Sequence, residues 1–353
     1  MSTSSDADKL PTRLLSAWDA GKREGKRQRD VADALGVSEA ELVSSACGDF
    51  VTRLSGDFRD LLLSLPQLGP VMALTRNDSC VHEKTGTYEN LSFEGHVGLA
   101  LGGDIDLRLF MSKWKTGYAL REMTKHGIRA SLQFFDPSGK AVHKIFLEPA
   151  SNQGGFDSLV SAFTDSDQGH EQPVNVAGDR ARADCGEDIE RDAFLHAWSR
   201  MRDTHEFFGM LRRFRLARRE ALTLAQNVYT RALGPDCARA VLERAAESGL
   251  PIMIFVGNPG CTQIHTGSVA NIQVMREWLN VLDPGFSLHL RETDIDRAWA
   301  VVKPTADGDV TSVELFDRRG EVIAMLFGKR KPGVPELAEW RALVEGLDSR
   351  VLS

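Results

Sequence analysis

The stretch Asn258-Pro-Gly-Cys-Thr-Gln-Ile-His-Thr-Gly267 repeats an earlier stretch of the chain, Asn77-Asp-Ser-Cys-Val-His-Glu-Lys-Thr-Gly86. The asparagine, the cysteine and the closing Thr-Gly pair match when the chain is displaced by 181 residues, the difference between 258 and 77. The same displacement, with no gap, aligns further pairs: Leu107 with Leu288, Ser131 with Ser312, Phe135 with Phe316 and Gly139 with Gly320. Matches at one fixed period indicate a tandem duplication, so we expect two copies of one structural unit.

Short apolar or alternating runs, separated by turn residues, fill most of each copy. In the first copy they are residues 71–74, 90–94, 97–101, 106–110, 131–135 and 141–147. Such runs predict strands of a mostly antiparallel sheet, and Asp136-Pro-Ser-Gly139 is typical of a hairpin turn. Helical patterns precede the strands in both copies. We therefore predict an α+β tandem structural repeat, in which each unit is a helical segment followed by a large, mostly antiparallel β-sheet.

These patterns divide the chain into three predicted segments. The N-terminal repeat of helices and sheet covers residues 12–148, and the C-terminal repeat covers residues 189–345. Residues 149–188 are rich in Asp, Gly, Gln and Ser, which favours a linker with one short helix near residues 156–163. A helical tail containing Trp340 closes the chain.

The composition argues against several classes of protein. The 353 residues carry a net charge of −7, with a pI of about 5.8, which opposes the phosphate contacts that nucleic-acid binding requires. No apolar run is long enough to span a membrane and no signal peptide is visible, so we expect a cytoplasmic protein that is not membrane-embedded. The five cysteines form no C-x-x-C pair, which predicts reduced thiols. Motifs of nucleotide-binding loops, zincins and serine hydrolases do not occur in the sequence.

Residues 31–42 imitate a helix-turn-helix, with Gly36 in the turn and Ser38 as the cap of the second helix. One interpretation is a DNA-binding regulator. The other is an ordinary helical hairpin, because the second helix carries Glu39 and Glu41 where a DNA reader needs cationic or amide side chains. The acidic helix and the acidic chain favour the hairpin.

The segment 203–218 joins one histidine, His205, to aromatic residues and several arginines. Two interpretations of its local structure are open. In one, a continuous helix places His205 on an apolar stripe with Trp198. In the other, Asp203 and Glu206 form a capping box, and the helix begins there. Both place an imidazole beside aromatic surface, where it could be a metal ligand or a structural histidine with an ordinary hydrogen bond.

Whole phrases of the sequence add information that single residues lack. Five of them are residues 73–86 (ALTRNDSCVHEKTG), 104–110 (DIDLRLF), 255–267 (FVGNPGCTQIHTG), 278–286 (WLNVLDPGF) and 326–333 (LFGKRKPG). These phrases closely resemble the HemS-type cytoplasmic haem-handling proteins, a family also called hemin-degrading or hemin-transport factors. The resemblance runs from about Trp18 to Trp340. It implies two pseudo-symmetric modules and a cleft for haem b (hemin) that is served by both halves.

The resemblance also assigns residues to haem. The family's proximal iron ligand lies in a D-x-H-x-F-F/Y context, which is His205 here, and its distal arginine lies in a D-L-R strand, which is Arg108. A neutral imidazole suits haem iron, and an arginine could reach a molecule on the other face of the ring. If the protein degrades haem, Arg108 would be the catalytic residue. The family's basic contacts to the haem propionates fall on Arg218, Lys303 and Arg330.

Two positions of the implied haem site differ from some members of the family. Phe327 stands where some relatives carry a tyrosine near the propionates, so this chain lacks one hydroxyl donor. Glu206 stands where some relatives carry a second histidine, which argues against transfer of haem between adjacent histidines. The internal repeat places His289 opposite Arg108, as expected of a residue that serves a site and not the shared fold.

Two functions fit the resemblance. The first is a cytoplasmic haem-binding protein of haem-iron acquisition, which accepts imported haem, for instance from a membrane haem importer, and delivers it to a haem oxygenase or another acceptor. The second is a haem-degrading enzyme that, with an electron donor, opens the porphyrin ring oxidatively and releases iron. Both need the same contacts to iron, so both stay open. The DNA-binding interpretation depends only on residues 31–42.

Overall fold

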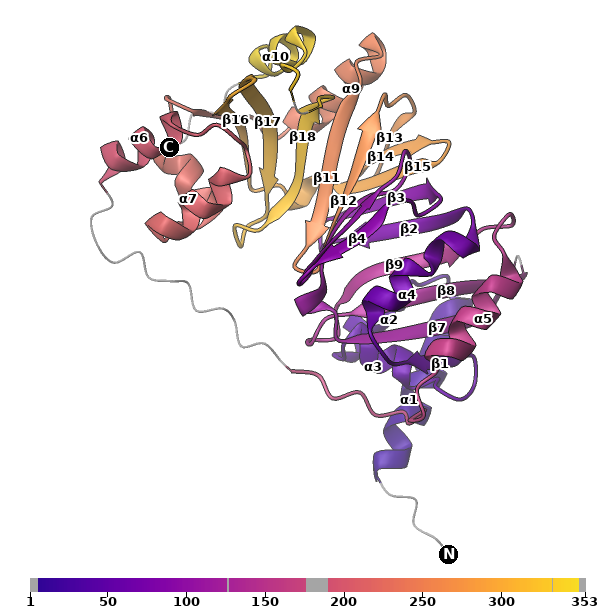
Figure 1. Cartoon of the computed structure of the whole chain (residues 1–353). Coiled ribbons are helices and arrows are strands. Elements are labelled where there is room, and N and C mark those ends of the chain that lie inside the picture. Colours follow the sequence, from indigo (N-terminus) through magenta and orange to yellow (C-terminus); the bar gives the residue numbers. More distant parts are fainter. Residues whose placement is uncertain (1–5, 126, 176–189, 332, 349–353) are drawn as a thin grey trace, which may run out of the picture. The chain divides into compact units, whose positions relative to one another are not determined.

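The computed structural model of the chain describes residues 6–125, 127–175, 190–331 and 333–348. Helices followed by strands occur twice along the chain, as the colours in Figure 1 show. The predicted linker is described only up to residue 175, and its remainder, with Cys185, lies outside the described residues. Within the described ranges, no helix is long and apolar enough to cross a membrane.

The first half of the chain contains the six predicted strands and three that the pattern did not predict, β1, β3 and β7. β1 is only four residues long, and charged side chains such as Glu83 and Arg121 interrupt the apolar runs of β3 and β7 and weaken their sequence signal. The predicted short helix is α5. The elements are α1 (Asp6–Arg23), α2 (Gln28–Leu35), α3 (Glu39–Ser44), β1 (Val51–Leu54), α4 (Phe58–Leu63), η1 (Leu65–Leu68), β2 (Val71–Arg76), β3 (Cys80–Gly86), β4 (Leu91–Glu94), β5 (Val97–Leu101), β6 (Asp106–Phe110), η2 (Met111–Lys113), β7 (Thr116–Thr124), β8 (Gly127–Phe135), β9 (Ala141–Leu147) and α5 (Gln153–Phe163).

The second half repeats this order of elements, with short 3₁₀ helices again labelled η. The elements are α6 (Arg191–Ser199), α7 (Glu206–Phe214), α8 (Arg218–Leu224), β10 (Thr230–Ala232), α9 (Cys237–Ser248), β11 (Ile252–Asn258), β12 (Cys261–Gly267), β13 (Ile272–Met275), β14 (Trp278–Asp283), β15 (Phe286–Arg291), η3 (Glu292–Asp294), β16 (Arg297–Thr305), β17 (Gly308–Phe316), β18 (Val322–Gly328) and α10 (Ala338–Glu345). The predicted helical tail is α10.

The strands form two nine-stranded antiparallel sheets. One has the order β1-β7-β8-β9-β2-β3-β15-β14-β13, and the other has the order β10-β16-β17-β18-β11-β12-β6-β5-β4. The two orders correspond strand by strand, with β1 in the place of β10 and β15 in the place of β6. The predicted α+β tandem repeat is therefore confirmed.

Each compact unit includes a short segment from the other half of the sequence. The first unit comprises residues 1–76, 84–179 and 258–262, and the second comprises residues 77–83, 180–257 and 263–353. The displaced segments begin at the asparagines of the repeated stretch, Asn77 and Asn258. The sequence pattern revealed the repeat but not this exchange.

Asn77 ties its exchanged segment into the second unit. Its Nδ2 donates to the backbone oxygens of Gly257 at 3.1 Å and Ile323 at 2.8 Å. Its Oδ1 accepts from the backbone nitrogens of Ser79 at 3.0 Å and Cys80 at 2.9 Å. One side chain thus stabilises the turn before β3 and fixes it to two other strands.

Asn258 makes the same contacts in the first unit. Its Nδ2 donates to the backbone oxygens of Arg76 at 2.9 Å and Val142 at 2.8 Å. Its Oδ1 accepts from the backbone nitrogens of Gly260 at 3.0 Å and Cys261 at 3.1 Å. The requirement for an amide, with two donors and an acceptor, explains why both copies carry asparagine here.

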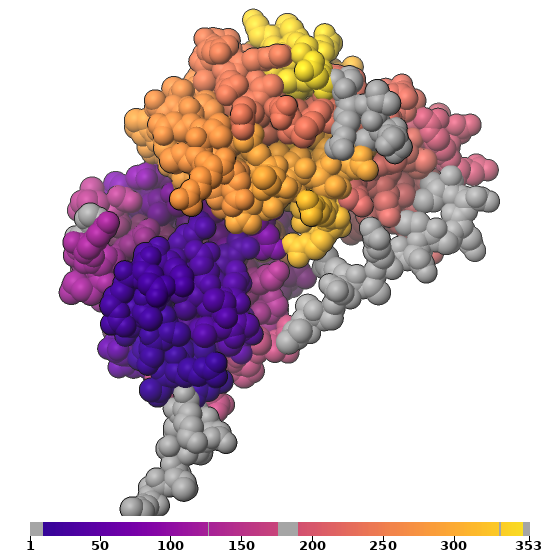
Figure 2. All heavy atoms as spheres, turned by 180° about the vertical axis from the view of Figure 1, so that it is seen from behind, coloured from indigo at the N-terminus to yellow at the C-terminus, as the bar shows by residue number. Residues whose placement is uncertain are grey.

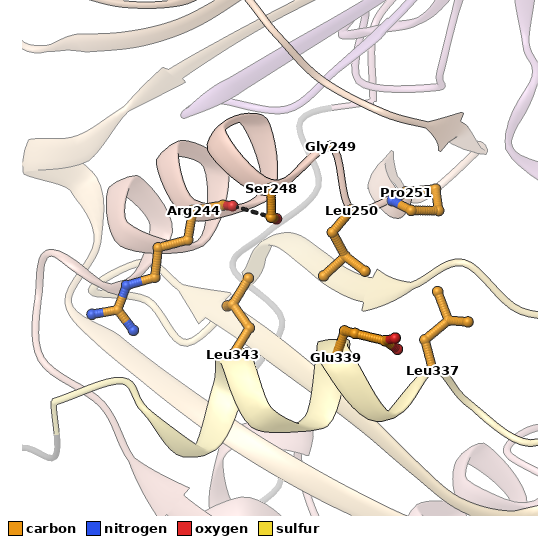
Figure 3. Close-up of a pocket in the computed structure, with 8 residues that line it drawn as sticks. All are labelled: Arg244, Ser248, Gly249, Leu250, Pro251, Leu337, Glu339 and Leu343. Carbon is orange, nitrogen blue, oxygen red and sulfur yellow. Dashed lines mark hydrogen bonds between the residues drawn. The ribbon is translucent and has the colours of Figure 1, made fainter.

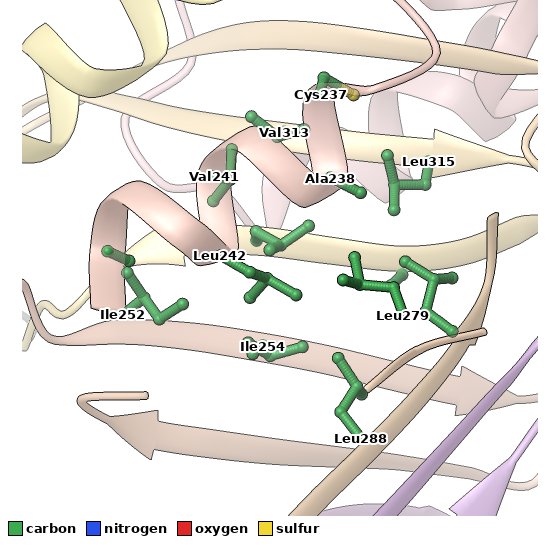
Figure 4. Close-up of a cluster of buried hydrophobic side chains, with 14 of the residues drawn as sticks. Cys237, Ala238, Val241, Leu242, Ile252, Ile254, Leu279, Leu288, Val313 and Leu315 are labelled. Carbon is green, nitrogen blue, oxygen red and sulfur yellow. The ribbon is translucent and has the colours of Figure 1, made fainter. Parts of the chain in front are cut away.

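In the second unit, helices cover both faces of the sheet. Along β16, Ala298 and Ala300 join the apolar cluster of α9 and α10, whereas Trp299 and Val301 join the cluster of α6, α7 and α8. This alternation is the period-two pattern of a strand buried on both faces. Figure 4 shows the first cluster, in which α9 lies over the strand side chains. The second face, which we call the α6–α8 face, carries the buried residues of the candidate site.

The first unit has the corresponding arrangement at β7. Tyr118 and Leu120 join the cluster of α1, α2 and α3, whereas Ala119 joins the cluster of α4 and α5. The N-terminal helices, coloured indigo, form a rounded surface of this unit in Figure 2. Each copy therefore places its first helices against one face of its sheet.

The helix-turn-helix imitation is a helical hairpin of α2 and α3. Gly36 adopts the left-handed conformation that ends α2, with a φ of 68°, and the Ser38 hydroxyl accepts from the backbone nitrogen of Glu41 at 3.2 Å. Glu39 is buried, and its carboxylate pairs with Lys144 and Arg76 of the sheet. The acidic side chain at the start of α3 is thus part of the first unit's interior.

Candidate functional site

The turn between α6 and α7 carries His205. Because α6 ends at Ser199 and α7 begins at Glu206, the helix is not continuous, and the predicted start of a new helix in this segment is confirmed. The predicted capping box of Asp203 and Glu206 is wrong, because His205 is the N-cap residue and the Asp203 carboxylate accepts from the backbone nitrogen of His205. His205 immediately precedes that helix. The turn is anchored on one side by Trp198, whose Nε1 donates to the backbone oxygen of Val302 at 3.0 Å.

The imidazole of His205 projects into solvent and is held by one neighbour. Its side chain is 92% exposed, and Nδ1 lies 2.6 Å from Oδ1 of Asp203. The same Oδ1 accepts from the backbone nitrogen of His205 at 2.8 Å. These two hydrogen bonds lower the pKa of Asp203. Because a carboxylate only accepts hydrogen bonds, a neutral His205 carries its proton on Nδ1, and Nε2 presents a lone pair to solvent.

Helix α7 separates a buried face from an exposed aromatic side chain. Phe207, Met210 and Leu211 are buried against the sheet. Phe208 is 64% exposed, and the guanidinium carbon of Arg212 lies 5.1 Å from its ring centroid. An exposed phenyl ring three residues after His205 offers apolar contact to a flat ligand at the imidazole.

A buried ion cluster lies on the α6–α8 face beneath α7. Glu314 of β17 accepts from Nε of Arg218 at 2.6 Å and from Nη2 of the same residue at 2.8 Å. It also accepts from Nζ of Lys303 at 2.7 Å and from the hydroxyl of Ser312 at 3.1 Å. Both cations lie over the ring of Phe207, at 5.0 Å for Arg218 and 4.8 Å for Lys303. We call Arg218, Lys303 and Glu314 the ion triad.

Burial and charge act in opposite directions in the ion triad. Burial alone would raise the pKa of Glu314, but the charges of Arg218 and Lys303 outweigh it and hold this pKa well below 4.5. Burial lowers the pKa of Lys303 to about 8, although Glu314 offsets part of the effect. Two cations and one carboxylate leave the triad with one positive charge, and the side chain of Arg218, at 25% exposure, is the part that solvent reaches.

Arg330 lies near the histidine turn. Its positive charge contributes to the lowered pKa of Asp203, and its Nη2 is 4.0 Å from a carboxylate oxygen of Asp307. Asp307 belongs to the hairpin loop between β16 and β17, which is tied to the turn because the backbone nitrogen of Ala306 donates to the oxygen of Arg202 at 2.9 Å. The structure therefore brings Arg330 and His205 into one neighbourhood.

Phe327 of β18 lies on the same sheet face as the ion triad. It is directly opposite Ser312 in the antiparallel ladder, and directly opposite residues of such a ladder project to the same side. Its ring is half-buried and meets Phe255 edge to face, with centroids 5.0 Å apart. The predicted residues His205, Arg218, Lys303, Arg330 and Phe327 thus all belong to the second unit.

Arg108 is the one predicted site residue of the first unit. On β6 its neighbours Leu107 and Leu109 are buried, so Arg108 points to the opposite side of the strand. Its guanidinium pairs with Asp106. The assignment of Arg108 to the distal side of haem stays a prediction of the family resemblance.

Sequence reasoning did not find Glu314, although it holds two of the predicted site residues. A signal was present, because Glu314 interrupts the otherwise apolar and small-residue strand from Val310 to Phe316. A carboxylate in a fully buried strand requires a cationic partner. Sequence alone gives no such partner, since Lys303 lies on the adjacent strand and Arg218 on a distant helix.

Two pockets of the second unit lie away from these residues. One, of about 570 Å³, lies between the end of α9 and the start of α10, where Leu337 and Leu343 face Leu250 (Figure 3). Its lining residues are Arg244, Ser248, Gly249, Leu250, Pro251, Leu337, Glu339 and Leu343. None of the predicted site residues lines this pocket, so we do not assign the site to it.

Comparisons with known proteins agree with the repeat and the fold. The chain matches the model of a haemin-degrading HemS.ChuX domain twice, over residues 36–163 and 215–347. It is 38% identical over 327 residues to the hemin transport protein HemS of Yersinia enterocolitica, which covers 92% of this chain and 94% of that protein. It is 40% identical over 324 residues to the hemin transport protein HmuS of Yersinia pestis, covering 92% and 93%.

Solved structures give the same result. Holo-PhuS, a heme-binding protein from Pseudomonas aeruginosa, is 43% identical with a TM-score of 0.93, covering 96% of this chain and 99% of that one. ChuS, a heme degrading enzyme of Escherichia coli O157:H7, is 35% identical with a TM-score of 0.89, covering 96% and 99%. The fold and the repeat define a protein of two tandem haemin-degrading-type domains. The chain belongs to the HemS family of hemin transport and degrading proteins.

Proposed function

We propose that the protein binds haem through His205 and carries it, within haem-iron acquisition, from an importing step to a consuming one. The observation that supports this most is the imidazole itself, which is exposed, fixed through Nδ1 and open at Nε2. Among the described residues, no three His, Cys, Asp or Glu side chains gather to hold a bare metal ion. Iron already held by a porphyrin needs only an axial ligand, so a single histidine fits.

The cations of the second unit suit the propionates of haem. Arg218 keeps one guanidinium edge near solvent while Glu314 holds the other, and Arg330 lies beside the histidine turn. Lys303 is buried, so its positive charge would act on a propionate mainly by adding to the charge of the ion triad. Phe327 and Phe208 add apolar surface. Arg108 would act from the distal side.

A second candidate function is oxidative degradation of haem. It is favoured by the 35% identity to ChuS, which is described as a heme degrading enzyme. In that function Arg108 would donate hydrogen bonds to a molecule opposite His205, and an electron donor would be required. Acceptors such as a haem oxygenase belong to the transport function, so an assay of the fate of haem distinguishes the two.

The ligand assignment is tested by titrating hemin into the wild type, His205→Ala and His196→Ala. His196 is an exposed histidine of the neighbouring helix α6 and is the matched control. We expect the Soret band of the wild type and of His196→Ala to agree, and that of His205→Ala to differ with weaker binding. An identical titration for His205→Ala would remove it as the ligand.

The fate of bound haem is tested by adding a physiological reductant with catalase present. A carrier keeps its Soret band under these conditions and gives up haem when a haem oxygenase is added. An enzyme loses the band, releases iron and forms a ring-opened product even with catalase. Repeating the assay with Arg108→Gln then separates a catalytic arginine, whose loss slows ring opening, from one that only contributes to binding.

A further inference from the structure

Two hydrogen bonds join the carboxylate of Asp203 to His205, one to its backbone and one to its ring. A single carboxylate oxygen accepts from the backbone nitrogen of His205 at 2.8 Å and lies 2.6 Å from Nδ1 of its ring. The first contact fixes the carboxylate relative to the backbone, and the second fixes the ring relative to the carboxylate. The direction in which Nε2 points is therefore set by the turn and does not depend on packing around an exposed ring.

The other charged side chains near His205, which are Glu206 and Arg330, have their closest contacts with other groups. Glu206 accepts from the backbone nitrogen of Arg202 at 3.3 Å and so stabilises the start of the turn. Arg330 acts on Asp203 through its charge, and its guanidinium lies 4.0 Å from Asp307. Of these carboxylates, Asp203 is the one whose oxygen lies within hydrogen-bond distance of the imidazole.

The internal repeat provides a comparison for this contact. Under a displacement of 179 residues, Asp203 and His205 fall opposite Glu24 and Lys26. In the first unit these two side chains also pair, with Nζ of Lys26 at 2.7 Å from a carboxylate oxygen of Glu24. The turn before this helix thus pairs an acid with a base two residues later in both copies. Only in the second copy is the base an imidazole, which has a second nitrogen to offer.

We infer that Asp203 is a positioning residue that keeps His205 in the Nδ1–H tautomer and strengthens Nε2 as a donor to haem iron. This inference rests on the proposed function. A metal-bound histidine whose other nitrogen donates to a carboxylate is more basic and better oriented than one that donates to water. Asp203 would thereby set both the affinity for haem and the strength of the bond between iron and histidine.

The test uses Asp203→Asn, Asp203→Ala and the matched control Asp192→Asn, an exposed carboxylate of α6, each loaded with hemin and then reduced. Asn keeps an acceptor oxygen but loses the charge, whereas Ala removes both. We expect the iron–histidine stretching band in resonance Raman spectra to move to lower wavenumber in Asp203→Asn and further in Asp203→Ala. We also expect haem affinity to fall about 10- to 100-fold in Asp203→Ala. Asp192→Asn should match the wild type in both measurements.

The outcomes separate this inference from the proposed function. A wild-type band position in both Asp203 variants would overturn the inference, even if His205→Ala loses the iron–histidine band. Retention of that band in His205→Ala would overturn the ligand assignment itself. Thermal unfolding of the haem-free variants serves as the check on structure, because a purely structural Asp203 would lower the melting temperature and leave the band of the remaining folded protein in place.

Discussion

Nζ of Lys303 lies 2.7 Å from Oε1 of Glu314, and both side chains are buried in the second unit. Removal of one partner leaves an uncompensated charge in the interior. We expect Glu314→Gln to lower the free energy of unfolding by roughly 3–5 kcal/mol, measured by urea denaturation. The exposed Glu89→Gln is the control for loss of a carboxylate and should change it by less than about 0.5 kcal/mol. A near-neutral Glu314→Gln would contradict the ion triad.

His143 of the first unit predicts a dependence of stability on pH. Its ring is buried, with Nδ1 at 2.8 Å from the hydroxyl of Thr75 and Nε2 at 2.6 Å from that of Tyr88, and burial lowers its pKa from 6.5 to about 3. As pH falls below 6.5, the unfolded chain takes up this proton and the folded chain does not until about pH 3. The contribution of a neutral, buried His143 to the free energy of unfolding is therefore fully present above pH 6.5 and is lost progressively as the pH falls to about 3.

Replacement of His143 by Gln removes this titration. The loss of unfolding free energy on acidification should become smaller by up to about 1.4 kcal/mol per pH unit relative to the wild type. Urea denaturation at several pH values between 6.5 and 4 measures the difference. The exposed His96→Gln should retain the wild-type slope. Equal slopes for His143→Gln and the wild type would show that His143 titrates normally.

Phe208 is expected to contribute apolar contact to haem without contributing to folding. Phe208→Ala should weaken haem binding by roughly 10- to 100-fold, the equivalent of losing the burial of one aromatic side chain. Its unfolding free energy should stay within about 0.5 kcal/mol of the wild type, because the ring is largely exposed. Leu63→Ala, which truncates an exposed side chain of α4, should leave haem affinity unchanged. Haem titration and urea denaturation of both variants decide the point.

Asn77 and Asn258 should contribute equally to stability, because their four hydrogen bonds correspond one by one. We expect either substitution by alanine to lower the unfolding free energy by roughly 2–4 kcal/mol, about 1 kcal/mol per lost bond. Asn258→Asp keeps the acceptor and loses both donors, so it should lie closer to Asn258→Ala than to the wild type. A large difference between the two alanine variants would mean that the exchanged segments differ in importance.

Much of the fold could be predicted because the sequence repeats itself and its apolar residues recur at regular spacings. The displacement of 181 residues and the alternating runs predicted two α+β units, and the glycine and serine between α2 and α3 predicted their hairpin. Strands β1, β3 and β7 were not predicted, because β1 is only four residues long and charged side chains interrupt the apolar pattern of β3 and β7. The exchange of segments between the units was not predicted, because local periodicity does not specify which of two duplicated strands pairs with a given strand.

The residues of the candidate site were predicted mainly from their places in motifs that resemble the HemS family, and less from their physical chemistry. The side chains of His205 and Asp203 are close in sequence, so their contact follows from a short turn. The partner of Arg218 and Lys303 is separated from Arg218 by 96 positions, and nothing in the local sequence connects them. The structure therefore adds most where the partners are distant in sequence.

The reciprocal exchange at Asn77 and Asn258 means that neither half of the chain encodes a whole unit. Expressed alone, either half would lack the segment that the other half supplies, and its own copy of that segment or a second molecule would have to fill the place. The exchange takes place within one chain, so each copy contributes a segment to the other without a second molecule.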